Sequence, residues 1–236
     1  IMTAHREATK MPTSNTTLIL TAVIAMCALS SCTGAIESVG VPVRAVVYGN
    51  SHGLVVGDDP GTFYIPYYSS TGGALVGCET DSGRVFDVPL GSSGGYGLCE
   101  GADGALYIGG VNPGDIYRYE PDSRDLQNLG GSEFGNDYIW DTAASPDGTK
   151  IYGACYPTAG VLEYDIESRE MRFLGSIREG IRYTRSITVD EDGYVWAGGA
   201  TTATLMVIDP ETGEKEEVLP ADCDANMVYS LRRDGR

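Results

Sequence analysis

Short apolar runs and polar turns alternate along most of the chain, and the whole pattern returns about every 44 residues. An Asp-Gly pair precedes a short apolar run at Asp103-Gly104, Asp147-Gly148 and Asp192-Gly193. A second apolar run follows in each unit and ends in a polar turn, at 121–123, 166–168 and 210–213. Runs rich in Tyr, Val and Ile predict strands, and Asp, Ser and Gly are typical of tight turns. The pattern therefore predicts a repeated unit of antiparallel strands.

A repeat of this length that contains only strands and turns predicts a β-propeller, an all-β fold. We expect four blades of four strands each and the start of a fifth. Their ranges are 43–91, 94–131, 136–177, 181–220 and 226–236. In the first blade the strands are expected at 44–48, 62–68, 73–78 and 84–90. An open stack of blades leaves strand edges and one blade face uncovered, so we expect the sequence to be a fragment of a ring of six to eight blades.

Residues 1–31 have the pattern of an export signal. Arg6 and Lys10 precede an apolar run at 18–29, which is shorter than the roughly 20 residues that a spanning helix needs. The run ends at Leu29-Ser30-Ser31-Cys32, which resembles the bacterial lipoprotein box with its lipidated cysteine. We expect a lipid anchor at Cys32, a tether over 32–42, and a place in the bacterial cell envelope, with the outer membrane or cell surface favoured. An ordinary secretory signal is the alternative.

The net charge of the chain limits the classes of partner that it can bind. The formal net charge of −17 argues against nucleic acid, because phosphate binding depends on Lys and Arg. Acidic runs at Asp58-Asp59 and 190–192 contain the oxygen ligands that calcium prefers, but Asp is also favoured in turns for its own hydrogen bonds. We therefore predict no metal or other cofactor, with calcium as the alternative.

Four cysteines follow the expected lipidation site, and their state is open. They are Cys78, Cys99, Cys155 and Cys223. Export permits disulfides, and four thiols allow three pairings. Buried free thiols are the alternative, since a free cysteine behaves as a small apolar residue.

The third and fourth units resemble a known group of proteins. The segments that carry the resemblance are 138–141, 146–148, 151–153, 164–165, 186–196 and 208–213. They are similar to repeats of bacterial secreted YVTN/NHL-like seven-bladed propellers, which include streptogramin B (virginiamycin B) lyases and gluconolactonase-like proteins. The lyase resemblance implies a histidine base and a metal near the central channel, and the gluconolactonase resemblance implies a metal held by Glu, Asn and Asp. After residue 32 the sequence contains one histidine, His52, and no matching acidic set.

Candidate functional side chains come from the innermost strand of each predicted blade. Counting back seven residues from the Asp of each turn gives Tyr96, Trp140 and Arg185, with Met227 and His52 at this offset in the last and first units. The neighbours Tyr138, Asp141 and Tyr183 complete a ring of aromatic and ionisable groups. We predict ligand binding by Tyr96, Trp140, Asp141, Tyr183 and Arg185, and His52, Tyr138 and Arg185 are candidate catalytic groups. Simple packing between blades is the alternative for the whole ring.

Three functions are compatible with these features. The first is an envelope lipoprotein whose propeller binds glycans or partner proteins. The second is a propeller enzyme, a lyase or a lactone hydrolase, that acts at the mouth of the channel. The third is a scaffold that arranges a downstream domain. We favour the binding module. The repeats themselves specify the blade and not an activity, because they encode the scaffold and function lies in the loops placed on it.

Overall fold

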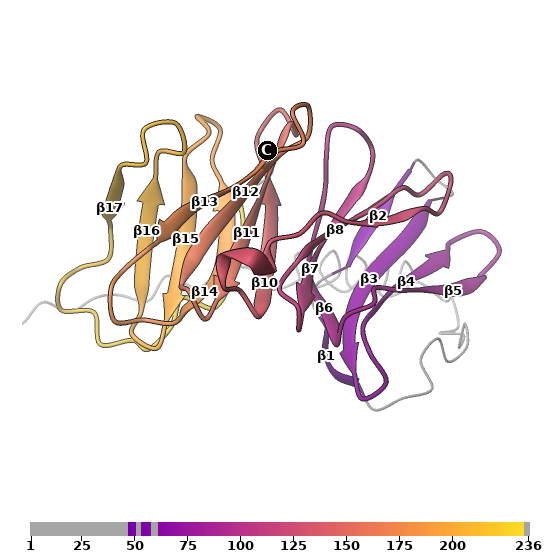
Figure 1. The fold of residues 1–236 in the computed structure, drawn as a ribbon, viewed down its shortest axis with the longest axis horizontal. Helices are drawn as coiled ribbons and strands as arrows, with labels where there is room; N and C mark the ends of the chain where they lie inside the picture. The colour runs from indigo at the N-terminus through magenta and orange to yellow at the C-terminus, as the bar shows by residue number, and fades with distance from the viewer. Residues whose placement is uncertain (1–46, 51–52, 58–60, 234–236) are drawn as a thin grey trace, which may run out of the picture. The chain divides into compact units, whose positions relative to one another are not determined.

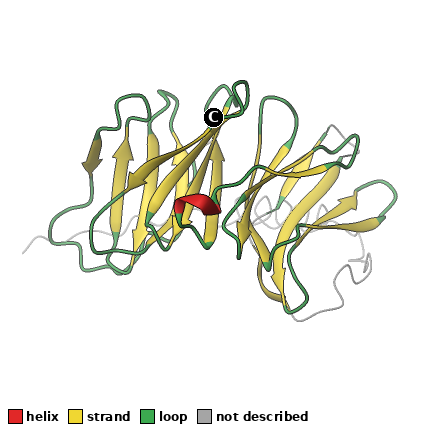
Figure 2. Ribbon diagram, viewed as in Figure 1, coloured by secondary structure: helices red, strands yellow, loops and turns green. Residues whose placement is uncertain are grey.

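The computed structural model describes residues 47–50, 53–57 and 61–233, which contain strands, turns and one 3₁₀ helix (Figures 1 and 2). Cys32, His52 and Asp58-Asp59 lie outside the described residues.

The first blade contains β1 (Val47–Asn50), β2 (Leu54–Val56), β3 (Thr62–Ser69), β4 (Ala74–Glu79) and β5 (Val85–Pro89). The second contains β6 (Gly94–Glu100), β7 (Leu106–Val111), β8 (Ile116–Tyr119) and β9 (Leu126–Asn128). The third contains η1 (Ser132–Phe134), β10 (Tyr138–Ala144), β11 (Lys150–Tyr156), β12 (Gly160–Asp165) and β13 (Met171–Ser176). The fourth contains β14 (Tyr183–Val189), β15 (Val195–Ala200), β16 (Thr204–Ile208) and β17 (Lys215–Glu217).

Each blade is an antiparallel meander, which confirms the predicted fold class. The order β14-β15-β16-β17 follows the chain, and the same order holds for β10 to β13. The first blade differs from the prediction, because β1 and β2 both pair with β3 in place of one strand at 44–48. Single bridges join successive blades, from Tyr68 to Gly94 and from Val111 to Tyr138.

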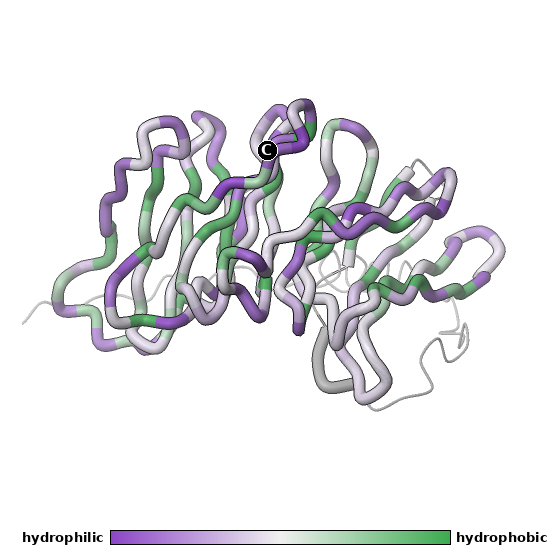
Figure 3. The backbone as a smooth tube through the Cα atoms, viewed as in Figure 1, coloured by the Kyte–Doolittle hydropathy of each residue, from purple (hydrophilic) through white to green (hydrophobic). Residues whose placement is uncertain are grey.

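The hydrophobic core lies between the blades. Three clusters of buried residues each draw their members from two successive blades. Between the first and second blades lie Tyr64, Leu75, Leu90, Leu98, Leu106, Ile108, Tyr117 and Tyr119. Between the second and third lie Ala105, Tyr107, Ile116, Ile139, Ile151, Cys155, Leu162 and Tyr164. Between the third and fourth lie Tyr152, Ala154, Val161, Ile177, Ile187, Val189, Val195, Ala197, Met206 and Ile208. Figure 3 shows hydrophobic segments along the strands and hydrophilic segments mostly in the turns.

The Asp-Gly turns owe their shape to local hydrogen bonds and to glycine. The Asp103 and Asp147 Oδ1 atoms accept backbone N–H bonds from residues two positions later. The following glycines, Gly104 and Gly148, have φ of 74° and 71°, which residues with a Cβ rarely adopt. These turns recur because each blade must reverse the chain after its innermost strand.

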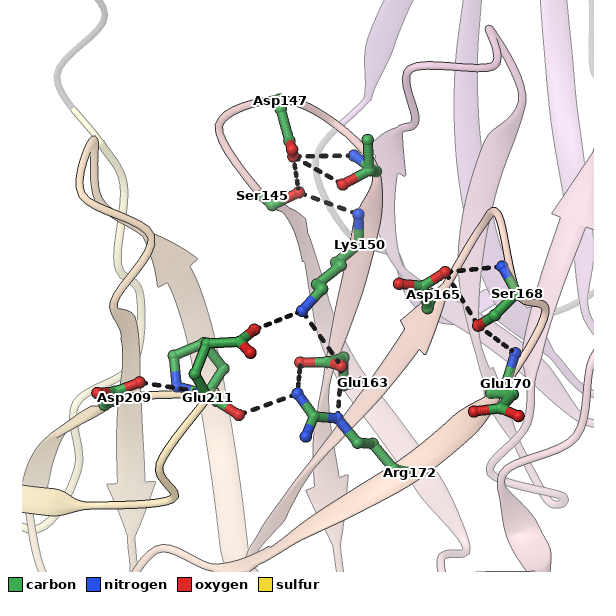
Figure 4. Close-up of polar contacts among 12 residues, drawn as sticks. Ser145, Asp147, Lys150, Glu163, Asp165, Ser168, Glu170, Arg172, Asp209 and Glu211 are labelled. Carbon is green, nitrogen blue, oxygen red and sulfur yellow. Dashed lines mark hydrogen bonds and ion pairs between the residues drawn. The ribbon is translucent and has the colours of Figure 1, made fainter.

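A polar network joins the third blade to the fourth (Figure 4). Glu163 on β12 is buried, and both of its carboxylate oxygens accept bonds from Arg172, at 2.6 and 3.0 Å. Arg172 also donates to the Pro210 carbonyl, and Lys150 bonds Glu211 at 2.7 Å. Pro210 and Glu211 belong to the turn that follows β16, so this network attaches the outer strands of one blade to the next.

All four cysteines of the described region are free thiols. Cys155 is buried, Cys223 is exposed, and Cys78 and Cys99 are half-buried. Burial of the thiol raises the pKa of Cys99 to about 12, and burial also raises the pKa of Cys155. The thiols of Cys99 and Cys155 thus serve as packing groups, in agreement with the free-thiol alternative.

The Glu163 network predicts a loss of stability when its buried carboxylate is removed. Glu163→Ala should lower the free energy of unfolding by about 2 kcal/mol, because Arg172 loses its partner in a partly buried site. Urea unfolding with an unchanged slope would measure the loss. The matched control is Glu167→Ala, an exposed residue nearby, which should stay within about 0.5 kcal/mol of the parent. Equal effects of the two variants would contradict the role of the network.

The cysteine environments predict selective alkylation of the folded protein. Only the thiolate reacts, and a pKa of about 12 leaves about one Cys99 thiol in ten thousand ionised at pH 8. Iodoacetamide at pH 8 should therefore modify Cys223 first and leave Cys99 and Cys155 unmodified, as read by peptide mass spectrometry. Raising the pH to 9.5 should still leave the alkylation of Cys99 slow. Rapid modification of Cys99 at pH 8 would show that its sulfur is not buried.

Candidate functional site

The innermost strands carry a β-bulge at the same position in three successive blades. The pairing register shifts between Gly95 and Leu98 on β6, between Ile139 and Asp141 on β10, and between Thr184 and Ser186 on β14. The residues inside these shifts include Tyr96, Trp140 and Arg185, the three side chains that the repeat spacing singles out. A bulge changes the direction of a side chain and is frequent beside functional sites.

The side chains at and beside these bulges form one group, which we call the inner cluster. Its members are Tyr96, Tyr138, Trp140, Tyr156, Arg182, Tyr183, Arg185 and Tyr229. Trp140 is at its centre, with Tyr138 stacked on it at 4.9 Å and Tyr96 edge-on at 4.8 Å between ring centroids. Tyr183 lies 4.5 Å from Tyr156 and 6.3 Å from Trp140. The cluster therefore joins the second, third and fourth blades through aromatic contacts.

Two guanidinium groups lie on the faces of these rings. The Arg185 guanidinium is 4.4 Å from the centroid of Tyr229, 5.1 Å from Trp140 and 5.8 Å from Tyr96. The Arg182 guanidinium lies 5.2 Å from the centroid of Tyr156. Both distances to the nearest ring are within the range of cation–π attraction.

The last described segment contributes to the cluster in a register that the sequence did not predict. Met227 forms a bridge with Ala200, as Tyr138 does with Val111, so Met227 is equivalent to Tyr138 and Tyr229 to Trp140. The prediction that Met227 is the counterpart of Trp140 is wrong. Counting back from the turn fails because the last unit has two fewer residues between this bridge and its Asp-Gly pair.

Asp141, the neighbour of Trp140 on β10, is buried between strands. Its Oδ2 accepts the backbone N–H of Ile187 on β14 at 3.3 Å and pairs with Arg232 at 3.4 Å. Its Oδ1 accepts the N–H of Thr142. The carboxylate thus links the third blade to the fourth and to the segment after β17.

Close approach of the strands beside Asp141 depends on glycine. A Cβ added at Gly97 would lie 2.5 Å from the Thr142 nitrogen, and one at Gly109 would lie 2.5 Å from the Ile139 carbonyl oxygen. No side chain fits at these distances, so the second and third blades meet backbone to backbone at the cluster.

Two tyrosines of the cluster, Tyr96 and Tyr183, are poorly suited to act as bases. Burial raises the pKa of Tyr96 above its ordinary value of 10.0, although the charge of Arg185 acts in the opposite direction. Burial also raises the pKa of Tyr183. A general base needs a pKa close to the working pH, so these two groups favour binding over proton abstraction.

In the acidic run at 190–192, the carboxylate of Asp190 accepts turn hydrogen bonds. Asp190 Oδ1 accepts N–H bonds from Asp192 and Tyr194, and its Oδ2 accepts the Trp196 indole N–H at 2.8 Å. Across the described part of the chain, no three metal-ligating side chains of His, Cys, Asp or Glu lie close enough together to hold a metal ion. The same residues include no helix long and apolar enough to cross a membrane.

Comparisons with solved structures support the fold. No protein-family model and no curated protein sequence matches the chain. Virginiamycin B lyase from Staphylococcus aureus is similar over 83% of this chain, with a TM-score of 0.66 and 18% identity. The extracellular domain of BT4673 from B. thetaiotaomicron is similar over 85% of this chain and 26% of its own, with a TM-score of 0.63 and 13% identity. A streptogramin B lyase is similar over 80% of this chain and 74% of its own, with a TM-score of 0.56 and 14% identity. The chain spans 63% of the length of the S. aureus lyase.

The contacts of Asp141 predict that it stabilises the blade junction. Asp141→Ala should lower the free energy of unfolding by about 2 kcal/mol, because the Ile187 N–H and Arg232 lose an acceptor in a buried site. Chemical denaturation measures this loss, and Asp137→Ala is the matched control because Asp137 is exposed on the same blade. A neutral effect of Asp141→Ala would mean that the carboxylate does not hold the blades together.

Proposed function

We propose that the chain is a ligand-binding propeller module that holds an oligosaccharide on the inner cluster. We further propose that it belongs to an envelope lipoprotein, attached to the membrane through a lipid at Cys32. The observation that carries the binding proposal is the concentration of five tyrosines and a tryptophan with two arginines where successive blades meet. Trp, Tyr and Arg are the residues that most often dominate binding energy at interfaces.

The chemistry of the cluster suits a sugar. Tyrosine and tryptophan present an apolar ring together with a polar group, which matches the C–H faces and hydroxyl groups of a pyranose. Tyr229 is 66% exposed and is the most open ring of the cluster. The indole N–H of Trp140 is buried and has no hydrogen-bond partner among the described residues.

A second candidate is a propeller enzyme, a lyase or a lactone hydrolase. Its support is the likeness in fold to virginiamycin B lyase, together with Tyr138 and Arg185 in the inner cluster. We favour binding because aromatic rings make up most of the inner cluster, and the raised pKa values of Tyr96 and Tyr183 argue against these two groups as a base. Product formation from a streptogramin B or a sugar lactone would support the enzyme instead.

The two tryptophans of the chain allow a direct test of the binding proposal. In Trp196→Phe the single remaining indole is Trp140, so a ligand on the inner cluster should change the emission of this variant. A panel of neutral and acidic oligosaccharides should include one that saturates the change, and calorimetry should give the same dissociation constant for the parent protein. Trp140→Ala should weaken this binding at least tenfold.

Trp196→Phe is the matched control for Trp140→Ala. The parent and Trp196→Phe should bind alike, because Trp196 lies outside the cluster and bonds Asp190. Absence of binding to every oligosaccharide of the panel would overturn the proposal. Retention of a protein partner by the parent but not by Trp140→Ala would move the function to protein binding.

A further inference from the structure

The charges of the inner cluster point to the class of ligand, an inference that rests on the proposed function. The chain holds 33 acidic and 16 basic residues, so carboxylates outnumber the cations that could pair with them. Arg118, Arg172 and Arg178 follow this expectation, since each bonds a carboxylate. Arg182 and Arg185 differ, because within the described residues neither has a carboxylate within 4.0 Å.

Aromatic rings hold these two arginines in place of acidic partners. A ring face attracts a guanidinium without neutralising its charge. Stacking occupies the flat face of the group, whereas its five N–H donors lie in the plane and point away from the ring. Arg185 touches rings from three blade units, namely Tyr96, Trp140 and Tyr229, and therefore loses little side-chain freedom when it binds a ligand. The arrangement is a fixed cation with unused donors.

We infer that the inner cluster recognises an oligosaccharide that carries a carboxylate, such as one with a uronic acid residue. The planar fork of a guanidinium matches the two oxygens of a carboxylate, and such charge-assisted bonds are about twice as strong as neutral ones. The sugar ring would lie on an exposed ring such as Tyr229, next to Arg185. The net charge of −17 repels a long polyanion, so a short oligosaccharide with few carboxylates fits better than a polymer.

The inference is tested by calorimetry with matched acidic and neutral sugars. The probes are a galacturonic acid trisaccharide and a neutral trisaccharide of galactose with the same linkage. The parent should bind the acidic sugar at least tenfold more tightly. Arg185→Gln should remove this preference by weakening the acidic sugar alone, and Arg185→Lys should keep part of it. The control Arg84→Gln removes an exposed arginine of the first blade that pairs with Glu79, and it should leave both affinities unchanged.

The outcomes separate this inference from the proposed function. Equal binding of the two sugars by the parent would overturn the carboxylate preference and leave glycan binding in place, and this comparison needs no variant. The carboxylate preference would also be overturned if Arg185→Gln bound both sugars equally more weakly than the parent does. Near-UV circular dichroism would first show that this variant is folded. A parent that binds a neutral glycan of the panel but not the galacturonic acid trisaccharide would also overturn it. Absence of binding to any glycan would remove the proposed function itself.

Discussion

The structure depends on the burial of each blade face against the next blade. A single four-stranded sheet has two apolar faces and cannot bury both by itself, so its stability comes from its neighbours. The three hydrophobic clusters lie between successive blades, and each draws Tyr, Leu or Ile from both sides. Close packing near the innermost strands requires glycine at positions such as Gly97 and Gly109. The same requirement brings the inner strands near enough for their side chains to meet.

This close packing also explains how the inner cluster arises. Where two backbones touch, the regular ladder of the inner strand is interrupted by a bulge, and the bulge aims Trp140 and Arg185 at the neighbouring strands. Trp140 then contacts rings from the blade before it and the blade after it. The inner cluster is therefore formed by side chains from several blades, and no single blade contains all of it.

Charge is distributed differently at the outer and inner strands. Away from the innermost strands, Arg172 on β13 and Lys150 on β11 pair with carboxylates and attach one blade to the next. At the inner strands, Asp141 links the third blade to the fourth by accepting a backbone N–H, and it also pairs with Arg232. Arg182 and Arg185 lie over aromatic rings. The outer pairs are satisfied within the protein, whereas no carboxylate of the described residues lies within 4.0 Å of the inner guanidinium groups. This contrast favours the inner cluster over the acidic turns as the functional surface.

The sequence by itself determined the β-propeller architecture and three of the bulge residues. The period of about 44 residues and the Asp-Gly turns are local signals, because turn chemistry and strand alternation act over a few residues. Only the tertiary structure decided the role of Asp141, the free state of the cysteines and the register of Met227 and Tyr229. Tyr156 and Arg182 also joined the cluster only through packing. These features depend on contacts between blades, and the spacing of residues along one strand carries no information about which groups of the next strand they meet.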